Sequence, residues 1–254
     1  MQRIVIIGAG MAGLTVALAL QRMGYTVSVY EQASEIREIG AGVVITPNGK
    51  RALDHLGIGQ IVADGAASVD TTHVRHYGTG EVLRELSRLA VIEQQGQPVL
   101  FVHRADLHAA LYEAVRMNDP DAVHAGKRFL DCKQNDDEVQ VKFEDGSTIV
   151  ADLLIGADGN ASGVRSAVFA PETPRFTGQV AMRALVPSDL VPPAIWEHPN
   201  SLFIGPNRLF LYYPLRGGSL LNVIAIGRAA QWEEEGWAIP ASNEEFKALN
   251  SDFH

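Results

Sequence analysis

The sequence predicts an α/β protein in two parts: a parallel β/α domain and a second domain built on a mostly antiparallel β-sheet. Two observations indicate this. Apolar strand-type runs alternate with helical runs through the first two thirds of the chain, beginning at Arg3. From Phe176 onward, strand-type runs follow one another with Pro and Gly between them instead of helices. The change of pattern predicts the change of domain.

The N-terminal residues predict a β-α-β unit of the Rossmann type. An apolar run, Ile4–Ile7, has the length and composition of a short strand, and Leu14–Met23 is rich in Ala and Leu. Between them Gly8, Gly10 and Gly13 form the spacing G-x-G-x-x-G. In such a unit the glycines permit a tight turn, a close approach of a pyrophosphate and close packing of helix on strand. The helix N-terminus then faces the phosphates.

A second strand, Val27–Tyr30, ends in an acid, Glu31, eighteen residues beyond Gly13. A carboxylate there accepts hydrogen bonds from the ribose hydroxyls and repels a 2′-phosphate, so we expect FAD or NAD, not NADP. A competing interpretation is a signal peptide or membrane span, because Ile4–Leu20 is a run of seventeen residues without a charge. The spaced glycines favour the nucleotide.

Composition excludes several classes of function. The formal net charge of −9 argues against nucleic acid or an anionic membrane as a partner. The single cysteine, Cys132, excludes an internal disulfide and a multi-cysteine metal site, and we expect it to be an inert thiol. We therefore expect a cytoplasmic protein without a metal.

Two features of the middle of the chain leave alternatives open. The turn Gly40–Gly42 precedes a brief strand, Val43–Ile45, and is either a simple loop or a surface that lies against the flat ring of a cofactor. Arg104 follows the strand Val99–Val102 and sits in the first turn of a helix, where a cation is unfavourable for the helix dipole. A bound anion explains it, and a solvated arginine is the alternative.

Residues 69–86 alternate around a Gly-Thr-Gly turn and predict a β-hairpin. Three further strands are predicted at Arg128–Lys133, Val139–Phe143 and Thr148–Ile155, the last two joined at an Asp-Gly turn. The third strand leads into Gly-Ala-Asp158-Gly, which we interpret as another strand end that faces the ligand. A serine-hydrolase elbow is excluded because G-x-S-x-G is not matched there.

The second sheet is predicted from four strand-type runs, Gln179–Val186, Ser201–Ile204, Arg208–Tyr213 and Ser219–Ile226. Pro171 and Pro174 mark a domain boundary near residues 171–176. We assign residues 1–68 and 98–172 to a discontinuous nucleotide-binding domain, and residues 69–97 and 173–254 to a substrate domain.

Taken together, these motifs resemble a known family. The order GAGMAG with Glu31, GAGVVITPN, HRADLH and DLLIGADGNASGVR is similar to that of the single-component FAD-dependent aromatic hydroxylases with the p-hydroxybenzoate hydroxylase fold. The later runs GQVAMRALVP and GPNRLFLYYPLRGGSLLNV look most like the branch of salicylate hydroxylase and 3-hydroxybenzoate 6-hydroxylase. The resemblance covers essentially the whole chain.

The resemblance implies a monooxygenase that uses FAD, NADH or NADPH as a transient reductant, and O2, and that hydroxylates an aromatic acid or phenol-like ring through a flavin C4a-hydroperoxide. It places Arg104 against the FAD phosphate or ribose, Asp158 near FAD with Arg165 as its helper, and Gly42 and Val43 along the flavin ring. On the substrate side it suggests three residues that point from the second sheet toward the flavin: Arg183, Tyr212 and Tyr213. The implied FAD contacts are Gly8, Gly10, Met11, Ala12, Gly13, Glu31, Gln32, Gly42, Val43, Arg104 and Asp158.

The chain departs from the family at two points. Val44 stands where 6-hydroxynicotinate hydroxylases carry a basic histidine, which argues against that substrate. The motif G-D-A-x-H is absent, so we expect an N-terminal fragment, a split protein or a truncated product, with weak or no hydroxylase activity alone. Another FAD or NAD oxidoreductase, and an inactive FAD-binding module, stay open as alternatives. A homodimer or a complementing C-terminal segment stay open as partners.

Overall fold

The computed structural model describes residues 2–36, 40–169, 175–229 and 239–254. Its residues form two compact units, one made of Met1–Glu38 and Leu107–Arg175, the other of Ile39–Asp106 and Phe176–His254. By packing, residues 40–68 and 98–106 therefore lie with the second sheet, although we group them with the nucleotide-binding domain from sequence. The residues around the expected boundary, 170–174, lie outside the described part.

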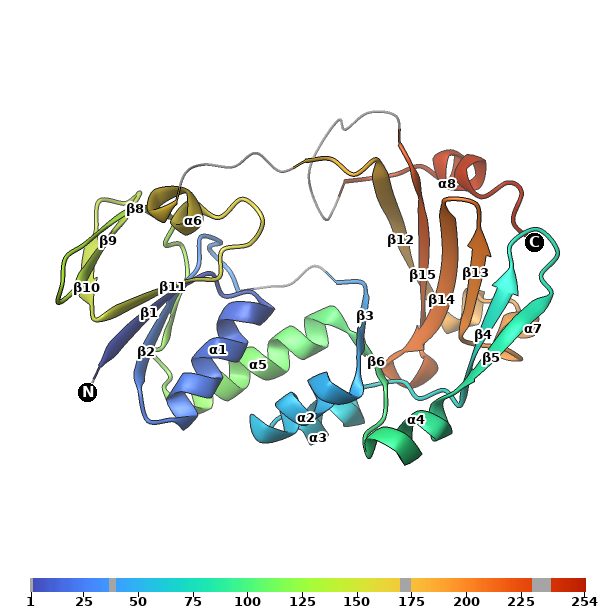
Figure 1. Ribbon diagram of the computed structural model, residues 1–254, viewed down its shortest axis with the longest axis horizontal. Coiled ribbons are helices and arrows are strands. Elements are labelled where there is room, and N and C mark those ends of the chain that lie inside the picture. Colours follow the sequence, from blue (N-terminus) through green and yellow to red (C-terminus); the bar gives the residue numbers. More distant parts are fainter. Residues whose placement is uncertain (1, 37–39, 170–174, 230–238) are drawn as a thin grey trace. The chain divides into compact units, whose positions relative to one another are not determined.

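The first unit is built on a parallel four-stranded sheet in the order β11-β1-β2-β7 (Figure 1). Ile4 pairs with both Val27 and Leu153 in parallel register. Apolar residues of β1 and β2 are almost fully buried because both faces of the sheet are covered. The strands are β1 (Arg3–Ile7), β2 (Thr26–Tyr30), β7 (Val123–His124) and β11 (Leu153–Gly156), and the main helices are α1 (Met11–Arg22) and α5 (Arg104–Asn118).

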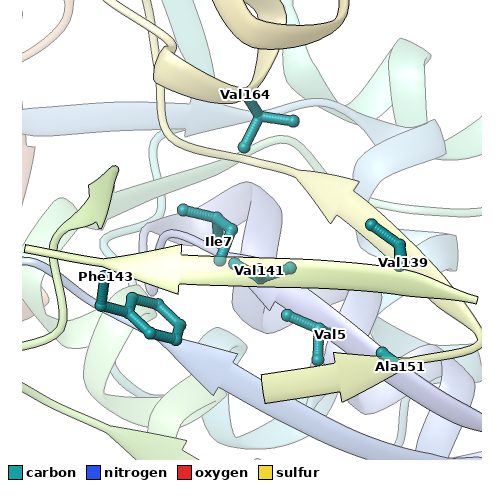
Figure 2. Close-up of a cluster of buried hydrophobic side chains, with 7 residues drawn as sticks. All are labelled: Val5, Ile7, Val139, Val141, Phe143, Ala151 and Val164. Atoms are coloured by element: carbon teal, nitrogen blue, oxygen red, sulfur yellow. The ribbon is translucent and has the colours of Figure 1, made fainter. Parts of the chain in front are cut away.

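A three-stranded antiparallel sheet, β8 (Phe129–Gln134), β9 (Val139–Phe143) and β10 (Thr148–Ala151), lies beside the parallel sheet, and the short helix α6 (Gly163–Val168) follows β11. Figure 2 shows the side chains that join these elements, with those of β1 and β9 turned toward one another. The cluster contains Val5, Ile7, Val139, Val141, Phe143, Ala151 and Val164.

The expectation of one strand over Thr148–Ile155 is wrong. The chain forms two strands in two different sheets: β10 pairs with β9, and β11 pairs with β1. Asp152 lies between them and anchors the break, because its carboxylate accepts a hydrogen bond from the Arg3 N–H at 2.6 Å and its own N–H donates to the Arg3 carbonyl at 2.9 Å. The apolar run shows no sign of this change of sheet.

The second unit is built on a six-stranded sheet in the order β12-β15-β14-β13-β4-β5, in which only the β13–β4 pair is parallel. This confirms the mostly antiparallel sheet and the hairpin over residues 69–86. A small pair of strands, β3 and β6, and five α-helices complete the described part of the unit. The strands are β3 (Gly42–Ile45), β4 (Thr71–His76), β5 (Val82–Ser87), β6 (Leu100–His103), β12 (Gln179–Pro187), β13 (Ser201–Gly205), β14 (Arg208–Leu215) and β15 (Leu220–Arg228). The helices are α2 (Pro47–His55), α3 (Gly59–Asp64), α4 (Arg88–Gln95), α7 (Pro193–Trp196) and α8 (Asn243–Leu249), of which α2 continues directly from β3.

Candidate FAD and substrate sites

The predicted nucleotide site lies at one edge of the parallel sheet. Because β1, β2 and β11 run in the same direction, their carboxyl ends meet there. The Gly8 N–H donates to the Tyr30 carbonyl at 2.8 Å, and the Ala157 N–H donates to the Ile7 carbonyl at 2.7 Å. The glycine loop and the Gly-Ala-Asp-Gly segment, far apart in sequence, are thus neighbours.

The three glycines of the G-x-G-x-x-G motif are explained by different features of the structure. Gly8 has φ +103°, and a side chain on it would meet the Ala157 carbonyl. A Cβ on Gly13 would collide with the Gly8 carbonyl. A Cβ on Gly10 would meet nothing within 4 Å. Gly8 and Gly13 are thus required by the protein's own packing, whereas the space at Gly10 fits the approach of a pyrophosphate.

Glu31 holds the loop from the end of β2. Its Oε2 accepts a hydrogen bond from the Ala9 N–H at 2.8 Å, and its Oε1 accepts one from the Ala33 N–H at 2.9 Å. Each carboxylate oxygen has a further lone pair for a ribose hydroxyl. Met11 and Ala12 open helix α1, where backbone N–H groups have no partner within the helix. Gln32 follows Glu31 and is exposed.

Asp158 organises the start of α6. One carboxylate oxygen accepts a hydrogen bond from the Ser162 hydroxyl at 2.5 Å, and the other accepts one from the Val164 N–H at 3.1 Å. Arg165, which we expect to assist Asp158, donates to the Asn160 carbonyl instead. The structure therefore gives Asp158 a clear local role, and its contact with FAD stays a prediction.

In the second unit, Gly42 lies against Tyr213. A Cβ on Gly42 would be 2.6 Å from a ring carbon of Tyr213. The Gly42 N–H donates to Asn222 Oδ1 at 3.0 Å, and Asn222 is fully buried. Gly40 is similarly close to the ring of His103, at 2.9 Å for an added Cβ. The packing of aromatic rings explains both glycines, and the position of Gly42 and Val43 along a flavin ring stays a prediction.

Arg104 is the first residue of α5, as expected, and its N–H donates to the Ala41 carbonyl at 3.0 Å. Two residues later, Asp106 balances the first turn with an acid. Asp106 forms a bidentate ion pair with Arg216, whose Nη2 and Nε donate to the two carboxylate oxygens at 2.7 and 2.8 Å. This pair holds the pKa of the Asp106 carboxyl below its usual range. The junction of β6 and α5 is thereby fixed beside the turn Gly40–Gly42.

The three substrate-side candidates do not share one face of the sheet. Arg183 of β12 lies opposite Ile224 of β15, and Tyr213 of β14 lies opposite Asn222 of β15. Because Ile224 and Asn222 are two residues apart on the same strand, Arg183 and Tyr213 lie on the same face of the sheet. Tyr212 points to the opposite face and packs among Val191, Phe203 and Leu221. The expectation that Tyr212 and Tyr213 point the same way is wrong, because successive residues of a strand alternate.

Burial raises the pKa of Tyr213 to about 12, and the charge of Arg183 opposes that shift. The phenol is therefore protonated at neutral pH and is able to donate a hydrogen bond. Tyr213 is 2% exposed and belongs to a core cluster with Phe101, Leu215 and Ile224. This face of the sheet is apolar apart from a few polar groups, as is usual for a small-molecule site.

Two residues that hold the predicted sites were missed from sequence. Asn222 is the one polar residue in the apolar run Leu220–Ile226, which could have signalled a buried hydrogen-bond partner. His108 lies on the buried face of α5, and its Nε2 is 2.7 Å from the Ala9 carbonyl. The signal in the sequence was a polar residue at a position where the helical periodicity predicts a buried side chain.

Other features of the described residues add no site. No group of three His, Cys, Asp or Glu side chains among them is placed to hold a metal ion. None of their helices is long and apolar enough to cross a membrane. A hollow of about 410 Å³ in the second unit is lined by Trp196, Pro199 and Pro214 among others, and contains none of the predicted site residues.

These features define a dinucleotide-binding protein with a second β-sheet domain. Residues 1–224 match the family model described as FAD binding domain. The chain belongs to this FAD-binding family, which confirms the expected fold class and identifies the cofactor as FAD rather than NAD.

Curated relatives of similar sequence are hydroxylases. The chain is 34% identical over 243 residues to a 3-hydroxybenzoate 6-hydroxylase of Klebsiella oxytoca, which covers 92% of this chain and 59% of the relative. It is also 34% identical to a 3-amino-4-hydroxybenzoate 2-monooxygenase, PtnB3, of Streptomyces platensis, covering 98% of this chain and 63% of the relative. The chain thus spans about three fifths of the length of these relatives.

Solved structures show the same likeness. Klebsiella pneumoniae HpxO, complexed with FAD and uric acid, superposes with a TM-score of 0.79 at 30% identity, covering 92% of this chain and 58% of HpxO. A salicylate hydroxylase substrate complex superposes with a TM-score of 0.80 at 25% identity, covering 99% of this chain and 63% of the other. The expected resemblance to FAD-dependent aromatic hydroxylases is confirmed.

Proposed function

We propose that this chain is the FAD-binding and substrate-binding part of a monooxygenase that hydroxylates a small aromatic acid or phenol-like ring. The observation that supports the proposal most is the glycine loop held by Glu31 in a member of the FAD-binding family. The names of the relatives supply the reaction class. FAD, when bound, supplies the redox chemistry between a nicotinamide nucleotide and O2.

The second sheet supports an acidic aromatic substrate. Arg183 supplies a positive charge for a carboxylate, and Tyr213 supplies a neutral phenol on the same face. The apolar side chains around Tyr213 exclude water and suit the edge and faces of a ring. Tyr212, on the opposite face, has no direct role in this proposal.

Several further assignments belong to the same proposal. The reductant is NADH or NADPH, bound transiently without a nucleotide-binding domain of its own, and O2 is the co-substrate. The compartment is the cytoplasm. A homodimer or a complementing segment is the proposed protein partner.

The test is made in two stages on the purified chain. First, FAD is titrated and followed by quenching of flavin fluorescence, for which we expect saturable, stoichiometric binding. Second, NADH and NADPH oxidation are measured with 3-hydroxybenzoate, salicylate, 3-amino-4-hydroxybenzoate and uric acid, with chromatography of the products. A hydroxylated product supports the proposal. FAD binding without stimulated oxidation by any of the four favours a non-catalytic FAD-binding module, and absence of FAD binding contradicts the proposal.

A further inference from the structure

The peptide groups on both sides of Ala9 are held by the protein. The Ala9 N–H donates to Glu31 Oε2 at 2.8 Å, and the Ala9 carbonyl oxygen lies 2.7 Å from His108 Nε2. His108 belongs to α5 and is only 5% exposed. Because a carbonyl oxygen only accepts, Nε2 must carry the proton of this hydrogen bond. Helix α5 therefore holds the glycine loop through a hydrogen bond between residues that are 99 positions apart in sequence.

The hydrogen bond from His108 also orients the next amide of the loop, the Gly10 N–H. In a trans peptide the C=O and the next N–H point in opposite directions, and the described residues contain no cis peptide bond. With the Ala9 carbonyl turned toward His108, the Gly10 N–H is aimed away from α5. A Cβ on Gly10 would meet nothing within 4 Å, so the backbone there is open to a ligand.

We propose that His108 is a positioning residue of the phosphate-binding loop: it fixes the Ala9 carbonyl so that the Gly10 N–H faces the pyrophosphate of the cofactor. This inference rests on the proposed binding of FAD. Glu31 fixes one peptide of the loop and His108 the next, so the two residues together set the direction of successive backbone amides before the ligand arrives. Preorganised N–H donors bind an anion without the entropy loss of ordering a loop.

The surroundings of His108 explain why a histidine is needed for this task. It shares the buried face of α5 with Leu107, Leu111 and Val115. A polar ring in such a place is unfavourable unless it is hydrogen-bonded. An apolar side chain there would leave the Ala9 carbonyl without this donor.

The experiment compares two amides of different length in the full chain. In His108→Gln the amide nitrogen lies as many bonds from Cβ as Nε2 does in histidine, whereas in His108→Asn it is one bond short. We expect His108→Asn to raise the Kd for FAD ~10-fold, the size expected when one hydrogen-bond partner is lost, and His108→Gln to stay within ~3-fold of the parent chain. His55→Asn, which alters an exposed histidine of α2, is the control.

A second measurement does not require FAD. Amide hydrogen exchange of the segment 7–14 is followed in the FAD-free chain, and we expect it to be ~10-fold faster in His108→Asn and close to the parent rate in His108→Gln. Unchanged exchange and unchanged FAD affinity in His108→Asn overturn the inference. Equal losses in both variants, in parallel with the thermal midpoint, also overturn it, because they indicate only a packing role. If the parent chain binds no FAD, the proposed function fails, and the exchange rates still decide whether His108 orders the loop.

Discussion

Glu31 shows how one side chain at a strand end orders the loop that is predicted to hold the ligand. Its two oxygens accept hydrogen bonds from the Ala9 and Ala33 N–H groups, and their remaining lone pairs are suited to a ribose diol. The residue type and its distance from the glycines are visible in the sequence. The two backbone partners are not, because they depend on how the chain turns after β2.

We expect Glu31→Gln to weaken FAD binding about 10- to 100-fold, since a hydrogen bond to a charged group contributes about 1.5–3 kcal/mol. The measurement is a titration of FAD followed by flavin fluorescence. Glu113→Gln, at an exposed position of α5, is the control and should bind FAD like the parent chain. An unchanged Kd in Glu31→Gln would show that Glu31 serves the loop alone.

Gly42 illustrates a glycine required by a neighbouring side chain. An added Cβ would lie 2.6 Å from the Tyr213 ring, so we expect Gly42→Ala to reduce the free energy of unfolding by about 1–3 kcal/mol through overpacking. Urea unfolding followed by circular dichroism measures the change. In Gly65→Ala the nearest atoms are at 3.9 Å, so that variant should be nearly as stable as the parent. Equal stability of the two variants would contradict the close contact.

Tyr213 also predicts a pH dependence of stability. Burial raises the pKa of its phenol from 10.0 to about 12 in the folded chain. The folded state therefore holds the proton more tightly than the unfolded state does, and this contribution is complete below pH 10 and is lost as the pH rises toward 12. We expect the thermal midpoint of the parent chain to fall more steeply over this range than that of Tyr213→Phe. Parallel curves for the two proteins would exclude a contribution from Tyr213.

At the scale of elements, the antiparallel sheet β8-β9-β10 is joined to the parallel sheet by one apolar cluster (Figure 2). Val141 is fully buried at its centre. The strand over Val139–Phe143 was predicted from sequence, and the structure shows which of its alternating residues are buried. The break at Asp152 was not predictable, because it depends on hydrogen bonds to Arg3, which is distant in sequence.

We expect Val141→Ala to reduce the free energy of unfolding by about 2 kcal/mol, because it removes two buried methyl groups and leaves a cavity. Leu130→Ala, at a position of β8 that is 59% exposed, should change it by less than about 0.5 kcal/mol. Denaturant unfolding of the two variants checks both values. Comparable losses would mean that the cluster does not carry the packing between these sheets.

At the scale of the whole molecule, charge restricts the partners. With a formal net charge of −9, the chain should be repelled by the phosphates of nucleic acids. We expect no retardation of a labelled DNA duplex in a gel at about 0.15 M salt, the physiological ionic strength. A lysozyme lane serves as the positive control for charge-driven retardation. A salt-sensitive complex with this chain would contradict the expectation and reveal a local basic surface.

The division into two units was only partly predictable from the sequence pattern. The change from alternating β/α elements to consecutive strands correctly predicted two kinds of sheet. It grouped residues 40–68 and 98–106 with the nucleotide-binding domain, whereas β3 and β6 pack with β14 and β15 in the second unit. A segment between two domains in sequence has no local signal for the sheet on which it packs.

The sequence by itself determined the β-α-β unit, the glycine spacing, the acid at the end of β2, and the two sheet types, because these depend on short-range periodicity and on backbone requirements of single residues. Tertiary structure alone decided which side chains meet. It brought Asn222 to Gly42 and His108 to Ala9. These contacts join residues about 100 or more positions apart, and their partners are chosen by the packing of sheets and helices rather than by local pattern.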